Sequence, residues 1–169
     1  RVFIVTWCAI PMFSCTSDLH TSQIVLYEGS DKIEMFIQDK PLCSGWNGGA
    51  AIQGLVDATS VNFDIVYDPV LLADRNYPLN WTASNEGWEF LPNGPNSYTI
   101  NSIPYTPIIA GTATWTDENG ILLGTGPVVN VTPPTTTTYY CSITGPCTGS
   151  TLLDSVTVTI PPSNNTVTT

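Results

Sequence analysis

Apolar and polar residues alternate in short runs along this chain, and no stretch keeps the spacing of an amphipathic helix. Residues 32–38 place Ile33, Met35 and Ile37 on one side of a strand, and residues 23–28 precede them across the short turn Gly29-Ser30-Asp31. This arrangement predicts a β-hairpin with one apolar face. Similar runs recur between Gly, Pro, Asn and Asp residues, so the pattern predicts an all-β protein with antiparallel sheets.

The strongest break in the pattern is the Pro- and Gly-rich stretch 91–96, where we place a domain boundary. The sequence thus predicts two consecutive antiparallel β-sandwich units, 1–96 and 97–160, followed by a linker at 161–169. In the first unit we expect strands at 2–7, 23–28, 32–38, 50–56, 62–67 and 87–91, and an irregular segment at 8–22. Because residue 1 leads directly into a strand, we expect this module to be N-terminally incomplete.

The second unit is predicted to resemble a short immunoglobulin-like sandwich. Trp115 lies on an early strand, Cys141 on the penultimate one, and Tyr139 stands two residues before Cys141, which is the spacing of a tyrosine corner. The expected strands are 97–100, 112–116, 121–123, 128–132, 138–144 and 155–160.

The charge balance limits the classes of partner that the chain is expected to bind. The chain has 4 Lys and Arg residues against 14 Asp and Glu residues, a formal net charge of -10. Phosphate backbones demand clustered Lys and Arg, so nucleic acid and anionic membrane surfaces are not expected partners. No apolar run is long enough to cross a bilayer. The acidic residues fit a solvated surface better than a calcium loop, and no metal or other cofactor is predicted.

Five cysteines in a Thr-, Asn- and Gly-rich chain indicate an oxidising compartment. Cys141 and Cys147 flank a short loop and are one candidate pair, while Cys15 and Cys43 are another. Cys8 is then left over, either as a buried free thiol or with a partner in another segment.

Two groups of residues raise the question of catalysis. His20 has Ser14, Ser17 and Asp18 nearby in sequence, but no nucleophile elbow accompanies them, and a loop histidine is the simpler interpretation. Glu86 and Glu89 flank an aromatic residue, as glycosidase carboxylates can, yet they fit a strand that ends the first unit better. No catalytic residue is therefore predicted, and the chain is not expected to be an enzyme.

Binding and modification sites have weaker signals. Trp46 and Asn47, followed by two glycines, could form a sugar-binding loop together with Trp81. The alternative is that Trp46 caps the core beside a Cys15–Cys43 bridge. Glycosylation could occur at three Asn-x-Thr triplets and at one short serine motif, which are centred on Asn80, Asn130, Asn164 and Ser155.

A set of motifs in the first unit carries a family resemblance. They are Thr21 to Glu28, Ile33-Glu34, Ile37, Lys40-Pro41, Cys43, the Trp46-Asn47-Gly48-Gly49 element, Asn80 to Ala83, Asn85-Glu86, Trp88, Phe90 and Pro92-Asn93-Gly94. In this order they resemble a module of the very large surface proteins of gliding bacteria. The hairpin at 23–38 is also similar, more weakly, to nidogen-type extracellular domains. The second unit looks like the immunoglobulin-like repeats that follow this module in those proteins.

The resemblance implies a jelly-roll or nidogen-like module followed by an immunoglobulin-like repeat, in an exported adhesin or filament of the bacterial cell surface. It further implies the type IX secretion route, a role in gliding motility, and partners among neighbouring domains, identical subunits or surface polysaccharide. The family supplies no catalytic residues. Two rival interpretations stay open: a carbohydrate-binding module of an exported polysaccharide-degrading enzyme, and a fibre subunit whose strand 2–7 or Thr-rich end completes a neighbour's sheet.

Overall fold

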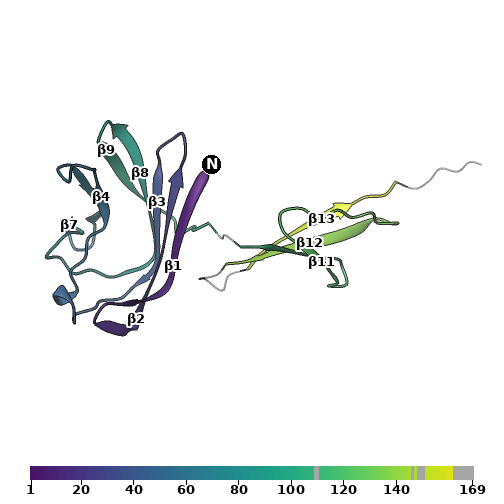
Figure 1. Cartoon of the computed structure of the whole chain (residues 1–169), viewed down its shortest axis with the longest axis horizontal. Helices are drawn as coiled ribbons and strands as arrows, with labels where there is room; N and C mark the ends of the chain where they lie inside the picture. The colour runs from purple at the N-terminus through teal and green to yellow at the C-terminus, as the bar shows by residue number, and fades with distance from the viewer. Residues whose placement is uncertain (109–110, 146, 148–150, 162–169) are drawn as a thin grey trace, which may run out of the picture. The chain divides into compact units, whose positions relative to one another are not determined.

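Antiparallel strands make up nearly all the regular structure of this computed structural model, which describes residues 1–108, 111–145, 147 and 151–161 (Figure 1). The chain divides into unit 1, Arg1–Ile108, and unit 2, Ile109–Thr169. The all-β prediction is confirmed. Within the described residues, no helix has the length and apolar character needed to cross a membrane.

Unit 1 is organised around one five-stranded antiparallel sheet in the order β1-β2-β3-β8-β9. The strands are β1 (Val2–Met12), β2 (Cys15–Tyr27), β3 (Ile33–Lys40), β8 (Ala83–Gly94) and β9 (Ser97–Ile103). The segment 8–22, expected to be irregular, belongs instead to the long β1–β2 hairpin. The register shifts between Trp7 and Ile10 and again between Pro11 and Met12, and these irregularities interrupt the simple alternation that sequence patterns detect.

The face of this sheet predicted to be apolar is indeed packed. Ile33 pairs with Phe90 and Met35 with Trp88, and these four residues form one core cluster together with Val66. Phe90 and Val66 are fully buried. Burial of a side chain as large as Phe90 contributes about 1.5–3 kcal/mol.

Short hairpins of unit 1 form a layer beside the sheet (Figure 1). Their strands are β4 (Gly54–Val56), β5 (Phe63–Ile65), β6 (Tyr67–Asp68) and β7 (Ala73–Asp74), and a short 3-10 turn, η1 (Asn47–Gly49), precedes them. Leu55 and Val66 from this segment pack in the same core cluster as Trp88. The layer is therefore joined to the sheet by buried apolar contacts.

The segment that follows β9 covers part of the other face of the sheet. The Gln23 amide donates to the Ile108 carbonyl and accepts from the Ile108 amide, both at 2.8 Å. Phe36 meets Tyr105 edge-to-face, with ring centroids 6.3 Å apart. A Cβ on Gly87 would lie 2.8 Å from the Pro104 carbonyl oxygen, so only glycine allows the segment this close approach.

Unit 2 contains one four-stranded antiparallel sheet in its described residues, in the order β11-β10-β12-β13. The strands are β10 (Ala113–Thr116), β11 (Leu122–Thr125), β12 (Thr137–Thr144) and β13 (Thr151–Val158). Trp115 pairs with Cys141, and its indole nitrogen donates to the Gly126 carbonyl at 3.0 Å. The strand expected at 128–132 is not formed, because this Pro-flanked stretch is part of the irregular connection between β11 and β12.

The predicted boundary at 96/97 is wrong. Residues 91–96 form the end and turn of the β8–β9 hairpin, and β9 belongs to unit 1. Tyr98 and Ile100 from β9 pack against the Trp88 and Phe90 cluster, which explains why the strand cannot leave this unit. The predicted linker at 161–169 lies outside the described residues, apart from Pro161.

The predicted bridge between Cys15 and Cys43 is present, with Cα atoms 5.7 Å apart. It ties the start of β2 to the connection after β3. The other predicted pair is wrong, because Cys141 on β12 carries a free thiol and does not bond to Cys147. Cys8, expected to be left over, is disulfide-bonded.

We expect the double variant Cys15→Ser/Cys43→Ser to lose about 2–5 kcal/mol of unfolding free energy, because the bridge restricts the unfolded chain. Denaturant unfolding under non-reducing conditions measures this loss. The matched control is Cys141→Ser, which removes a free thiol and no covalent link. Equal stability of the double variant and the wild type would contradict the role given to this bridge.

A second prediction concerns Asp57 in the β4–β5 loop. Its carboxylate accepts hydrogen bonds from the Asn62 amide at 2.7 Å, from the Thr59 hydroxyl at 2.8 Å and from the Val61 backbone. These bonds, with Asn62 foremost, lower its pKa from 3.8 to about 2. The folded value lies below the unfolded one, so the contribution to stability is full above pH 3.8 and is lost as pH falls through about 2.

Replacement Asn62→Ala should raise the Asp57 pKa toward 3.8, as followed by NMR titration of the carboxyl carbon. Asn101→Ala provides the control, since that amide bonds to Glu89 on the sheet instead. An unchanged Asp57 titration in Asn62→Ala would show that this amide does not hold the loop.

Candidate functional site

The residues predicted to contact a glycan do not lie together on one aromatic surface. Trp46 is 52 % exposed, just before η1, and its ring meets Phe13 edge-on at 4.7 Å. Trp81 is only 4 % exposed, and its indole nitrogen donates to the Ala51 carbonyl at 2.9 Å. Asn47 is exposed and has a positive φ of 46°. Trp46 is therefore available to a ligand, whereas the Trp81 ring belongs to the core.

A buried arginine lies at the centre of unit 1. Arg75 Nε donates to Asp68 at 2.9 Å, and Nη1 donates to the side-chain oxygen Oε1 of Gln53 at 2.7 Å. The Glu86 carboxylate accepts from Nη1 and Nη2. Only 5 % of the Arg75 side chain is exposed. We call Arg75, Asp68, Glu86 and Gln53 the Arg75 cluster. It joins three segments that are separate in sequence: Gln53 ahead of β4, Asp68 and Arg75 at the β6–β7 hairpin, and Glu86 on β8.

Two tryptophans border the Arg75 cluster. The Arg75 guanidinium carbon lies 4.4 Å from the centroid of the Trp81 ring and 5.5 Å from that of Trp88. The Trp88 indole nitrogen donates to Glu86 at 3.0 Å. Arginine over an aromatic face is stabilised by cation–π attraction, which is strongest away from water. Glu86, considered as an acid or base in the sequence, is thus occupied by Arg75 and Trp88.

The charges in the cluster reinforce one another. Burial alone raises the pKa of Asp68, but hydrogen bonds from the Leu71 amide and from Arg75 outweigh it and hold that pKa below its usual range. Burial also opposes the charge on Arg75, yet Glu86 and Asp68 keep its pKa above the usual value. Asp68 and Arg75 therefore stay ionised, and together with Glu86 they line a cleft of about 930 Å³.

Lys40, the other buried cation, has a different environment. It is 5 % exposed, its ammonium group donates to the Trp81 carbonyl at 2.6 Å, and it lies 4.3 Å from the Trp81 ring centroid. No carboxylate in the described part of the chain forms an ion pair with it. Burial, and secondarily the charge on Arg75, lower the pKa of Lys40.

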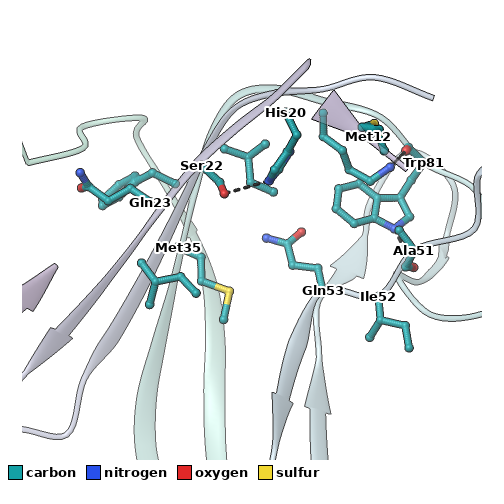
Figure 2. Close-up of a pocket in the computed structure, with 13 residues that line it drawn as sticks. Met12, His20, Ser22, Gln23, Met35, Ala51, Ile52, Gln53 and Trp81 are labelled. Atoms are coloured by element: carbon teal, nitrogen blue, oxygen red, sulfur yellow. Dashed lines mark hydrogen bonds between the residues drawn. The ribbon is translucent and has the colours of Figure 1, made fainter. Parts of the chain in front are cut away.

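Lys40 borders a cavity of about 260 Å³, which we call the Lys40 cavity (Figure 2). His20, Ser22 and Gln53 also line it, and no Asp or Glu does. One buried polar atom of a residue that lines this cavity, Gln53 Nε2, has no hydrogen-bond partner among the described residues. Gln53 therefore belongs to both sites: its side-chain oxygen bonds to Arg75, and its Nε2 donor has unused hydrogen-bonding capacity at the Lys40 cavity.

His20 lies on β2, not in a loop as expected, because the β1–β2 hairpin extends through this segment. Its Nε2 is 2.8 Å from the Ser22 hydroxyl, whereas the predicted neighbours Ser14, Ser17 and Asp18 make no such contact with it. Burial lowers the pKa of His20, although the Asp39 backbone partly offsets this. Within the ranges that the structure describes, no carboxylate bonds to Nδ1, the position that the orienting carboxylate of a catalytic triad occupies.

Most of the predicted glycosylation positions lie on the surface of the described structure. Asn80, Asn130 and Ser155 are exposed, and Asn164 lies outside the described residues. Among the residues that the structure describes, no group of three or more His, Cys, Asp or Glu side chains could hold a metal ion.

Sequence reasoning did not identify Arg75, Gln53 or Lys40 as interacting residues. The sequence offered one hint, the rarity of basic residues: Lys40 and Arg75 are two of only 4 basic residues in an acidic chain.

Comparison of this chain with protein-family models, curated proteins and solved structures gave no match.

The Arg75 cluster allows a direct test. We expect Arg75→Ala to lower the free energy of unfolding of the chain by about 3–5 kcal/mol, because Asp68 and Glu86 would be left as unpaired, largely buried charges. Chemical denaturation measures the loss. The matched control is Arg1→Ala, which breaks an exposed pair with Glu28 and should leave the unfolding midpoint nearly unchanged. Comparable effects of the two variants would contradict the assigned role.

Proposed function

We propose that the chain is a non-catalytic, structural and adhesive segment of an exported bacterial surface protein. In this proposal unit 1 is a jelly-roll or nidogen-like sandwich and unit 2 an immunoglobulin-like one, as in the adhesins that the sequence resembles. The type IX route and a role in gliding motility rest on that resemblance alone.

The observation that carries the proposal is that buried charged residues of unit 1 form ion pairs that stabilise the fold. Arg75 donates to both Asp68 and Glu86 and so joins the short hairpins to the sheet, which means that these three residues support the fold. The Cys15–Cys43 bridge adds a covalent tie to the same unit. Disulfides of this kind persist in oxidising environments, which supports an extracellular location.

An exposed apolar edge supports the adhesive part of the proposal. β1 is the edge strand of the five-stranded sheet, and four of its large apolar side chains are 40–63 % exposed: Val2, Phe3, Trp7 and Ile10. Edge strands pair readily with strands of other chains, and exposed apolar side chains favour such contacts. The edge thus suits a neighbouring domain or an identical subunit.

The exposed Trp46 supports one alternative, a carbohydrate-binding module of an exported polysaccharide-degrading enzyme. Its ring and the adjacent Asn47 amide are the groups that contact sugars in many binding loops. The buried Trp81 is a poor test residue, because its loss would disturb the core.

The proposal predicts adhesion without catalysis. Beads coated with the full chain should be retained under flow on surfaces coated with the same chain or with bacterial surface polysaccharide, and polysaccharide incubated with the chain should release no new reducing ends. Albumin-coated beads provide the baseline. Retention equal to that baseline, or sugar release that disappears in Glu86→Gln, would overturn the proposal. Glycan affinity lost in Trp46→Ala at an unchanged melting temperature would establish the alternative instead.

A further inference from the structure

The Lys40 cavity contains hydrogen-bond donors that the fold leaves unused. Gln53 is only 6 % exposed, and its side-chain oxygen accepts a hydrogen bond from Arg75. Because the Gln53 side-chain oxygen faces Arg75, the Nε2 donor points away from Arg75. Figure 2 shows the amide pointing toward the space between His20, Ser22 and Met35. A buried donor without an acceptor costs free energy and is rare in native proteins.

The Lys40 cavity is bordered by a lysine and by no acidic residue. Lys40 has three N–H donors, and within the described part of the chain it donates one hydrogen bond, to the Trp81 carbonyl. The lining contains no carboxylate, although the whole chain has a net charge of -10. A buried ammonium group without a counter-ion is costly unless an anion approaches it. Electrostatic complementarity therefore favours a ligand with a single negative charge.

Apart from His20, Ser22 and Gln23, the rest of the wall is apolar. It is formed by Met12, Ile24, Met35, Ile37 and Trp81. A dry cavity of about 150 Å³ is known to hold benzene, so about 260 Å³ has room for an aromatic ring or a short alkyl chain with a carboxylate attached. A phosphate or a free sugar would leave these apolar side chains without contacts.

We propose that the Lys40 cavity binds a small amphipathic monocarboxylate, whose carboxylate accepts hydrogen bonds from Lys40 and Gln53 and whose apolar body packs on Met35, Ile37 and Trp81. This site is independent of the adhesive function proposed above. It gives the chain a recognition site for short aliphatic or aromatic acids.

Calorimetric titration of the full chain with phenylacetate and with hexanoate tests the proposal. We expect saturable binding of both acids, and binding of the neutral analogue phenylacetamide that is weaker by about tenfold or more, because a charge-assisted hydrogen bond is lost. Failure of both acids to bind, or equal affinity for the amide, would overturn the proposal. The cavity would then be an underfilled or water-filled part of the core.

Two variants locate the binding. Lys40→Met keeps the length and packing of the side chain but removes the ammonium, and Gln53→Glu retains the acceptor for Arg75 while replacing the donor with an acidic oxygen. Each should weaken phenylacetate binding by about tenfold or more. Lys32→Met, which removes a cation bonded to Glu34, is the control and should bind normally.

Melting temperatures measured for all three variants show whether a loss of binding follows from unfolding. Affinity in folded Lys40→Met or Gln53→Glu equal to that of the wild type would place the ligand elsewhere and refute the site. If Lys40→Met does not fold, Gln53→Glu decides the question by itself.

Discussion

The architecture of unit 1 depends on one buried cation. Arg75 bonds to Asp68 in its own hairpin, to Glu86 on β8 and to Gln53 ahead of β4, and it lies against two tryptophans. Desolvation of such charges is expensive, so the cluster need not add net stability over an apolar core. What it does impose is specificity, since any other arrangement of these segments would leave a carboxylate or the guanidinium buried without its partner.

Two features of the fold that depend on residues close together in sequence were predicted correctly from the sequence. The alternation of Ile33, Met35 and Ile37 predicted the buried face of β3, and the turn at 29–31 predicted its hairpin with β2. The boundary failed because a Pro- and Gly-rich turn has the same signature whether it joins two domains or two strands of one sheet. Only the packing of Tyr98 and Ile100 on Trp88 decides between them, and that contact depends on the tertiary fold.

The candidate binding residues likewise include some that the sequence pattern reveals and others that only the tertiary fold reveals. An exposed tryptophan beside an asparagine and glycines can be recognised in a sequence, and Trp46 is indeed exposed. The free amide end of Gln53 cannot be recognised in this way, because it follows from a bond to Arg75, 22 residues away. Likewise, nothing in the sequence around Lys40 indicates that this lysine is buried. Its burial beside Trp81 results from pairing between β3 and β8.

The Gln53 side chain belongs both to the Arg75 cluster and to the lining of the Lys40 cavity. Its oxygen completes the set of acceptors around Arg75, and its nitrogen faces the Lys40 cavity. The same cluster that holds the layers together therefore orients a donor toward the cavity. Because Arg75 fixes the amide in one orientation, a ligand that accepts from Nε2 would not have to immobilise this side chain first, which lowers the entropic cost of binding. The rigidity that the Arg75 cluster gives to Gln53 would in this way preorganise the binding site proposed for the Lys40 cavity.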